Sequence, residues 1–329
     1  MLGGASFVAA VLSVSLGIGA ALADEIIIGG TGAAYGLAGR LSEAFSAAYP
    51  GDTVDLVPGL GSSGGIEAVT AGSLHVSFSG RPVKTEEKAK GLQEMPFVDS
   101  PFVFVSSHPK PQKLGKGDVL AIFSGTLTKW PDGKDISPIL RPRGDSDTGF
   151  LVSNFEGMEA ALEKLRQRRD VPIAGTDQDN IAAAEKTPYS FAGSTLTQIV
   201  TESSRVKIIP LDGVVPTIER MEKGEYPLRK RIYVVTKADP SPGAQRFLAF
   251  LRSPEADKIV RESGGVMARP KRQVRVSPNG LDLTGVLASA IIQGPTTVQS
   301  CACRMSIGIA TTTKDQIFRS KNIEICSLS

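Results

Sequence analysis

Segments with the pattern of a β-strand alternate with segments with the pattern of an α-helix through most of this chain, between residues 25 and 265. The run EIIIGG (25–30) is apolar and ends in glycine, as a buried strand does. In 36–49 the apolar residues recur at helical intervals, and TVDLVPG (53–59) is the next strand-like run. Such alternation is typical of βαβ units, so the sequence predicts an α/β fold with mixed, mainly parallel sheets.

The later segments continue the alternation. Further helices are expected over four segments and inside a fifth, namely 65–72, 119–125, 154–169, 243–265 (a pair broken at Ser253–Pro254) and part of 187–202. Further strands are expected at 75–80, 101–107, 136–143, 206–213 and 230–237.

Length and charge limit the class of protein. A chain of 329 residues suggests two domains, and 41% hydrophobic residues is ordinary for a globular protein. The formal net charge of +3 is too small to indicate nucleic-acid binding. Residues 24–300 contain no cysteine, so the body of the fold is expected to be held by its apolar core without disulfides.

The two ends of the chain differ from its body. Residues 7–22 are apolar or small, and Ala21–Ala23 fits the small-x-small rule for signal cleavage, although no Lys or Arg precedes the run. We expect residues 1–23 to be a signal peptide cleaved after Ala23, which makes the protein exported and periplasmic. A buried N-terminal helix is the alternative. Residues 271–329 have no sustained period and are expected to be a tail outside the fold, or else a third small domain.

Four short loops rich in Gly, Ser, Thr or Arg follow predicted strands. They are GGTGAA (29–34), GLGSSGG (59–65), SFSGRP (77–82) and RPRGDSDTGF (141–150). In an open α/β sheet the ligand binds outside the carboxyl ends of the strands. Small residues and helix N-termini there present N–H groups to an anion, and Arg adds a charged fork. The sequence therefore predicts an oxyanion site, with the alternative that each loop is a plain turn.

Enzymatic readings have less support in the sequence. The first loop lacks the Lys of a P-loop, and a dinucleotide fingerprint starting at Gly30 would put Tyr35 at its third glycine. The two histidines have no evident catalytic partners, and no residues have metal-ligand spacing. We expect no catalytic residues, no metal and no cofactor; a Rossmann-type oxidoreductase remains an alternative.

Several motifs in series resemble the periplasmic phosphate-binding proteins of ABC uptake systems, within the type 2 periplasmic binding protein class. The motifs are GLGSSGGIEAVTAG, VSFSGRP, AIFSGTLTKWPDG, IIPLDGVVPTIERMEKGEYPLRKRIYVVTK and FLAFLRSPEADKIV. The similarity covers roughly residues 25–268.

This resemblance implies two lobes joined by a hinge, with one oxyanion buried between them by hydrogen bonds. Lobe I would comprise 24–100 plus 207–268, and lobe II 101–206. The residues that the resemblance assigns to phosphate are the Thr31 hydroxyl, the Gly32 N–H, Ser62, Ser63, Ser79, Arg141 or Arg143, Ser146 and Thr148.

Two departures from the family bear on specificity. The fourth loop, RPRGDSDT, spaces its arginines differently from the family pattern and has Asp147 in place of a glycine. Gly80 stands where well-known members have an acceptor Asp. We hypothesise that Asp145 or Asp147 supplies this acceptor, because an unpaired buried acceptor discriminates strongly between protonated and unprotonated anions. The alternative is that both carboxylates cap the 154–169 helix.

Together these observations predict a monomeric, exported solute-binding protein. It would capture phosphate or a related tetrahedral oxyanion and deliver it to an ABC permease in the membrane. Use of the same fold for sensing or surface attachment is the alternative function.

Overall fold

The computed structural model describes residues 24–268, which lie within one compact unit of the chain. The expectations of a cleaved signal at 1–23 and of a tail at 271–329 lie outside the described residues.

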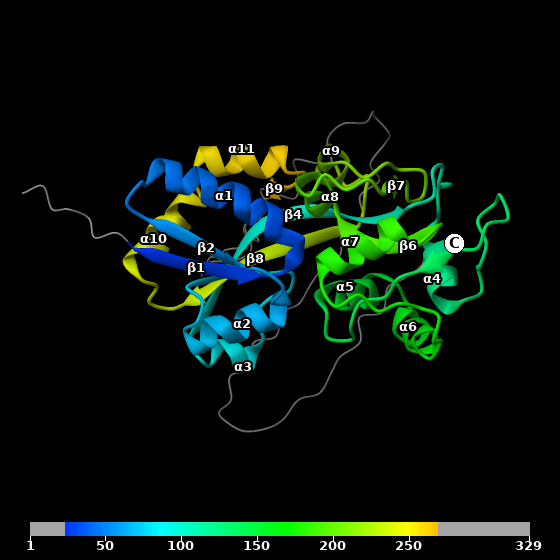
Figure 1. Ribbon diagram of the computed structural model, residues 1–329, viewed down its shortest axis with the longest axis horizontal. Coiled ribbons are helices and arrows are strands. Elements are labelled where there is room, and N and C mark those ends of the chain that lie inside the picture. Colours follow the sequence, from blue (N-terminus) through cyan, green and yellow to red (C-terminus); the bar gives the residue numbers. More distant parts are fainter. Residues whose placement is uncertain (1–23, 269–329) are drawn as a thin grey trace, which may run out of the picture. The chain divides into compact units, whose positions relative to one another are not determined.

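Strands of the first lobe form the parallel part of the sheet. β1 (Glu25–Gly30) lies between β2 (Thr53–Val57) and β3 (Val76–Ser79) and is parallel to both. The connecting helices α1 (Tyr35–Ala48) and α2 (Gly61–Ala71) pack on opposite sides of these strands (Figure 1). This β1-α1-β2-α2-β3 arrangement is the βαβ pattern that the sequence predicts.

Two long strands carry the antiparallel part. β8 (Arg229–Lys237) pairs antiparallel with β3 and with β4 (Leu92–Ser106), and the strand order is β2-β1-β3-β8-β4-β6-β5. β4 also pairs antiparallel with β6 (Ser190–Thr195), β7 (Lys207–Ile209) and β9 (Val266–Met267), whereas β5 (Ser137–Pro138) and β6 are parallel. The sheet is therefore mixed, as expected, and all antiparallel strand pairs involve β4 or β8.

The remaining helices surround these strands. They are the 3-10 turn η1 (Gly32–Ala34), α3 (Thr85–Lys88), α4 (Lys116–Ser124), α5 (Ser146–Asn154), α6 (Met158–Arg166), α7 (Asp177–Lys186), α8 (Leu196–Thr201), α9 (Ile218–Glu222), α10 (Pro242–Phe250) and α11 (Pro254–Glu262). The predicted break at Ser253–Pro254 is confirmed, since the Ser253 side chain accepts from the Ala256 N–H and caps α11.

Three predicted segments have different bounds in the structure. The helix expected at 154–169 is shorter and spans Met158–Arg166 (α6), because the chain turns at Gly157, whose φ is +78°, and α5 ends before this turn. The helix expected inside 187–202 is α8 (Leu196–Thr201), whereas residues 190–195 form β6, whose strand state depends on pairing with β4. β4 starts at Leu92 rather than at residue 101, with a register shift after Pro96 that accommodates the proline.

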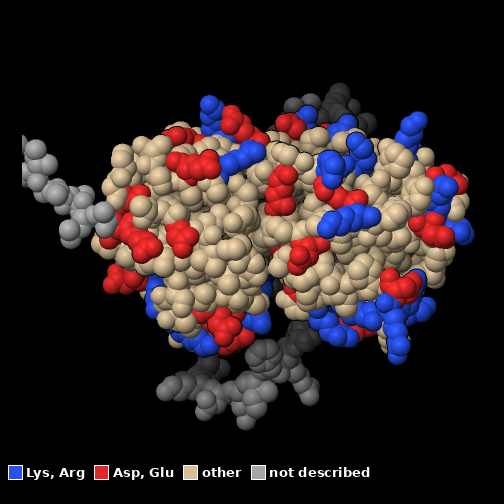
Figure 2. Space-filling model, in the orientation of Figure 1, with Lys and Arg blue, Asp and Glu red and all other residues tan. Residues whose placement is uncertain are grey.

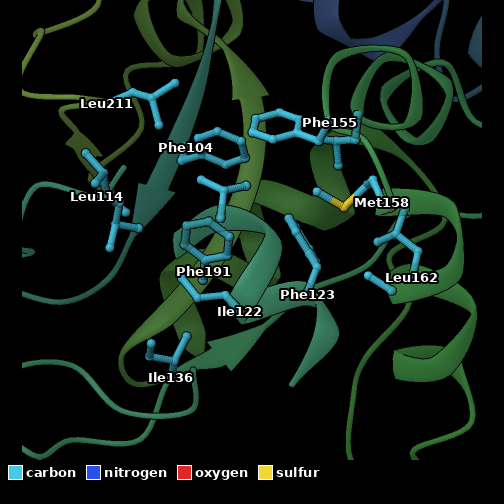
Figure 3. Packing of buried hydrophobic residues seen from close by; sticks show 14 of the residues in the cluster. Phe104, Leu114, Ile122, Phe123, Ile136, Phe155, Met158, Leu162, Phe191 and Leu211 are labelled. Carbon is cyan, nitrogen blue, oxygen red and sulfur yellow. The ribbon is translucent and has the colours of Figure 1, made fainter. Parts of the chain in front are cut away.

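Each lobe has its own apolar cluster. In the first lobe Ile28, Leu37, Phe45 and Phe247 are fully buried together. In the second, shown in Figure 3, the ring of Phe104 stacks on Phe191 with centroids 5.2 Å apart. Residues within 207–228 also pack in this second cluster, namely Ile209, Leu211, Tyr226 and Leu228. The sequence analysis expects that segment in lobe I, whereas its apolar contacts place it with lobe II.

The chain crosses between the two clusters on β4 and β8. Val98 belongs to the first cluster and Phe102 to the second, while on the return Leu228 belongs to the second and Ile232 to the first. The two crossings lie side by side, because β4 and β8 are paired from Leu92↔Lys237 to Pro101↔Arg229.

A buried carboxylate joins the two crossing strands. Asp99 of β4 is 1% exposed and accepts from the Arg231 Nε (2.7 Å) and Nη2 (2.8 Å) of β8. Arg229 Nη1 adds a third contact at 3.1 Å. A carboxylate held by two guanidinium groups is fully paired, so the ion cluster fixes the local register of the crossing.

Candidate anion-binding site

The loop after β1 presents donors at the boundary between the lobes. Thr31 is buried, and its N–H donates to the Phe78 carbonyl oxygen (2.8 Å), which fixes the loop to the end of β3. Gly30 has φ +122°, and a β-carbon there would lie 2.0 Å from the same oxygen, so this turn requires glycine. The Thr31 hydroxyl and the Ala33 N–H both point to a carboxylate of the other lobe, Asp177.

The GLGSSGG segment is the first turn of a helix. α2 begins at Gly61, four residues before the expected start, so Ser62 and Ser63 are helical. Ser62 is buried and its Oγ accepts from the Gly80 N–H (2.9 Å) at the end of β3. Ser63 is exposed and its Oγ accepts from Arg81 Nη2 (3.2 Å). Of the two serines, only Ser62 is buried among the strand ends.

Gly65 explains why this turn contains so many small residues. A β-carbon there would lie 2.7 Å from the Gly30 Cα and 2.3 Å from the Ser77 Oγ, whereas one at Gly64 would meet nothing nearer than 3.7 Å. We therefore expect Gly65→Ala to lower the free energy of unfolding by about 1–3 kcal/mol through overpacking. Gly64→Ala, in the same helix, should instead raise it by about 0.5–1 kcal/mol, as alanine favours helix.

Equilibrium urea unfolding of the two variants beside the parent chain measures this difference. Equal effects of the two substitutions would contradict a close approach of α2 to β1 at Gly65.

The third loop holds its serine internally. The Ser79 hydroxyl donates to the Arg81 carbonyl oxygen (2.7 Å). Gly80 faces the other lobe, and a β-carbon there would lie 2.5 Å from the Ser146 Oγ and 3.2 Å from the Lys230 Cε. The space beside position 80, where well-known members of the resembled family carry an acceptor Asp, is thus filled by two side chains of this protein.

The two arginines of the fourth loop have different environments. Arg141 is 6% exposed; it donates to the Ala174 carbonyl oxygen (2.8 Å) and to Asp145 Oδ2 (2.8 Å). Its Nη2 lies 3.4 Å from Asp177 Oδ1, and its buried Nε has no hydrogen-bond partner. Arg143 has a 71% exposed side chain and pairs with Glu163 (2.6 Å). The buried cation of this loop is Arg141.

The polar residues at the start of α5 have two kinds of contact: one caps the helix, and two contact Lys230. Asp145 is its N-cap, since Oδ1 accepts from the Asp147 N–H (2.8 Å). The Ser146 Oγ accepts from Lys230 Nζ (3.1 Å), and the Asp147 carboxylate pairs with the same ammonium group. The alternative considered from the sequence was that both carboxylates cap the 154–169 helix, whereas here Asp145 caps α5 and Asp147 pairs with Lys230.

The last polar residue of the loop, Thr148, contacts its own lobe. Its hydroxyl donates to the Pro142 carbonyl oxygen (2.9 Å). This bond closes the turn that leads into α5.

Sequence reasoning missed two residues at this boundary, Lys230 and Asp177. Lys230 is 1% exposed on β8, and Asp177 is 4% exposed as the first residue of α7. The Thr-Asp-x-Asp pattern at 176–179 marks the start of α7, and its capping box is formed. Local pattern does not reveal that this helix end faces the loop after β1.

Burial raises the pKa of two of the carboxyl groups here. The pKa of Asp177 is raised to about 7, chiefly because burial disfavours its charge, with the Asp147 charge adding and Arg141 opposing. The pKa of Asp145 is also raised, by burial first and then by the Asp147 charge. With Arg141 and Lys230, the three carboxyls form a buried five-residue ion cluster, which carries one excess negative charge when fully ionised.

Charges elsewhere on the molecule are mostly at the surface. Figure 2 shows acidic and basic side chains interspersed on one face. Exposed pairs such as Lys129–Asp135 (2.7 Å) and Arg168–Asp170 (2.5 Å) are solvated and stabilise little. The buried ion cluster therefore differs from these pairs in that its charges are shielded from solvent.

A cavity of about 580 Å³ adjoins the ion cluster between the lobes. The first lobe lines it with Arg81 and Tyr233, and the second with Ser146 and Phe150, while Lys230 reaches both the cavity and Asp147. Its basic and hydroxyl lining suits an anionic solute.

Residues 18–255 match the model of the PBP superfamily domain, which is well over half of the chain. The chain belongs to the PBP superfamily. This membership, together with the β2-β1-β3-β8-β4 order, decides against the Rossmann-type alternative and agrees with the family resemblance seen in the sequence.

Individual relatives of this PBP-superfamily chain include phosphate-binding proteins. The phosphate-binding protein PstS of Bacillus subtilis is 24% identical over 268 residues, covering 78% of this chain and 84% of that protein. The structure of a putative phosphate ABC transporter substrate-binding protein with bound phosphate from Clostridium perfringens matches with TM-score 0.65, 19% identity and coverage of 74% and 100%. The periplasmic molybdate-binding protein of Azotobacter vinelandii matches with TM-score 0.52, 17% identity and the same coverage. The two structural matches show a shared fold.

Two features are absent from residues 24–268. No helix there has the length and apolarity needed to cross a bilayer. No three His, Cys, Asp or Glu side chains in that range are grouped to hold a metal ion.

Proposed function

We propose that this chain is an exported solute-binding protein that captures phosphate, or a related tetrahedral oxyanion, between its two lobes for an ABC permease. One observation carries the proposal. The Thr31 hydroxyl and Ala33 N–H of the first lobe and the Arg141 guanidinium of the second converge on one carboxylate, that of Asp177. We call these three donors the cradle. A cradle that binds carboxylate oxygens is chemically suited to the oxygens of phosphate.

Capture would use hydrogen bonds and charge, without covalent chemistry. The cradle would bind the solute oxygens, and the unpartnered Nε of buried Arg141 would supply a further donor. Two serine hydroxyls, Ser62 of the first lobe and Ser146 of the second, would be further hydrogen-bond partners for the solute. Bending at the β4–β8 crossing would close the lobes on the solute and present one surface to the permease.

Export and assembly complete the proposal. Residues 1–23 would be removed after Ala23, and the mature protein would act as a periplasmic monomer. The phosphate-binding relative from Bacillus subtilis and the phosphate-bound protein from Clostridium perfringens support phosphate as the solute.

Calorimetry of the mature protein with phosphate, sulfate and molybdate tests the proposal. We expect phosphate to bind, and Arg141→Lys to weaken its binding about tenfold or more, because an ammonium group cannot reproduce the guanidinium fork. Arg143→Lys makes the same change two residues away, at an exposed side chain paired with Glu163, and should change the affinity less than about twofold.

Two results would count against the proposal. Binding of none of the three anions would exclude oxyanion capture. Equal losses from the two arginine variants would exclude Arg141 as the binding cation.

A further inference from the structure

Asp177 reaches from one lobe into the donors of the other. Its Oδ2 accepts from the Ala33 N–H (3.1 Å) and from the Thr31 hydroxyl (3.4 Å), and its Oδ1 lies 3.4 Å from Arg141 Nη2. Both oxygens of one carboxylate are thus used by the cradle. A carboxylate offers the same acceptor chemistry as two oxygens of a phosphate group, so Asp177 makes the contacts that a bound oxyanion would make.

The packing around this contact leaves no space for a second anion. A β-carbon placed on Gly32 would lie 2.8 Å from both the Cβ and the Oδ2 of Asp177, and 2.4 Å from the Gln178 Oε1. The Gln178 side chain also donates to the Gly32 carbonyl oxygen (3.0 Å). A solute oxygen that takes the Ala33 N–H therefore has to replace the Asp177 oxygen.

Electrostatic repulsion also disfavours binding of an anionic solute beside the Asp177 carboxylate. The buried ion cluster contains three carboxyls and two cations, all within the second lobe except Lys230 of β8. When all three carboxyls are ionised, an entering oxyanion would add negative charge where one negative charge is already in excess. Withdrawal or protonation of Asp177 removes that repulsion.

We propose that Asp177 is an internal competitor for the solute: its carboxylate takes the cradle donors, ties the two lobes together, and leaves the cradle when an oxyanion binds. The identity of the solute rests on the proposed function. The contact between the lobes rests only on the geometry of Asp177.

The competition should depend on pH. The charged groups that face Asp177 are Arg141, Asp145 and Asp147 of its own lobe and Lys230 of β8, and Glu202 lies behind Gln178. The first lobe faces it with the uncharged Thr31 and Ala33. Because the pKa of Asp177 is about 7, the carboxyl is largely neutral below that pH and is then a weaker acceptor and no longer an anion. Competition should be weak at pH 6 and strong at pH 8.

Hydrogen exchange at Ala33 tests the contact between the lobes without any solute. The full mature protein, dialysed free of phosphate, is compared with Asp177→Ala and with Asp179→Ala. Asp179 gives a matched control, since it is an exposed carboxylate of the same helix, hydrogen-bonded to Thr176 in its own capping box and not to the first lobe. We expect the Ala33 amide to exchange about tenfold faster in Asp177→Ala and at an unchanged rate in Asp179→Ala.

Calorimetry with inorganic phosphate tests the competition. Asp177→Ala should bind phosphate about tenfold more tightly than the parent at pH 8 and should show a smaller affinity difference between pH 6 and pH 8. Asp177→Asn keeps the side-chain volume and replaces the alanine variant if that variant does not fold. It should change the phosphate affinity and its pH dependence in the same direction, but by a smaller amount.

The outcomes separate this inference from the proposed function. Unchanged Ala33 exchange in the Asp177 variants would overturn the inference. Weaker phosphate binding by Asp177→Ala would also overturn it, because Asp177 would then help to bind the solute, while the proposed function would stand. Absence of anion binding by the parent and by every variant would overturn the proposed function and, with it, the competition.

Discussion

Replacement of Lys230 by methionine is expected to lower the free energy of unfolding by about 3–5 kcal/mol at pH 7. Lys230 is 1% exposed and Asp147 is 2% exposed, and the ammonium group also donates to the Ser146 Oγ (3.1 Å). Methionine keeps most of the side-chain volume, so the loss comes from the Asp147 charge that is left buried without a partner. Equilibrium urea unfolding measures the loss.

Two further variants show whether the unpaired charge is the cause. The double variant Lys230→Met with Asp147→Asn should recover a large part of the loss, because no uncompensated charge then remains. Lys129→Met, which breaks the exposed pair with Asp135, should change stability by less than about 1 kcal/mol. An equal loss in the single and double Lys230 variants would show that packing, rather than charge, dominates at this site.

Stability should fall as the pH rises from about 4.5 to 7, and Asp177→Asn should remove most of that fall. The pKa of Asp177 is raised from its usual 3.8 to about 7, so the folded protein binds a proton there that the unfolded chain has already released. The free energy of unfolding therefore decreases with pH across this interval. A shift of this size corresponds to on the order of 4 kcal/mol, and the raised pKa of Asp145 acts in the same direction.

Carboxyls with a lowered pKa act below this interval, whereas the pKa of Glu202, raised by burial, adds to the fall within it. Hydrogen bonding to Arg81 lowers the pKa of Glu87 to about 2, and the pKa of Asp52 is lowered by Arg246. Their contribution is present above their usual pKa and is lost only as the pH falls below about 4.5.

Urea midpoints at pH 4.5, 5.5, 6.5 and 7.5 for the parent, Asp177→Asn and Asp179→Asn measure the slope. Asp179→Asn makes the same chemical change at an exposed site and should keep the parental slope. A parental slope in Asp177→Asn would place the proton on another group of the buried ion cluster.

Local pattern predicted the first lobe better than the second. The apolar run of β1, the helical spacing of α1 and the strand β2 needed only information from neighbouring residues, and they appear as expected. β6 could not be predicted in this way, because its strand state depends on pairing with β4, which lies about ninety residues away in the chain. The extension of β4 through Pro96 likewise depends on its partner β8.

The candidate site shows the same limit of prediction from local sequence pattern. Arg141 and Ser62 lie in segments whose local composition indicates anion binding, and both are buried at the lobe boundary. Lys230 and Asp177 lie on elements that look ordinary in the sequence, and they reach the boundary only because the chain crosses between lobes on β4 and β8. The role of Gly80 also becomes clear only in three dimensions, where its missing side chain makes room for Ser146 and Lys230.

The paired crossing of β4 and β8 limits which motions the lobes can make. The two strands form a ladder from Leu92↔Lys237 to Pro101↔Arg229, and Asp99 ties them with Arg231 near the Pro101 end. Sliding one strand past the other would break successive ladder bonds together, whereas bending or twisting the two-stranded ribbon leaves them intact. If the lobes move as proposed, this ribbon would permit them to rotate but not to translate along the strands. Such a motion would part Ala33 from the first turn of α7 and bring it back to the same contact, because the strand register that aligns the two halves of the cradle would stay unchanged.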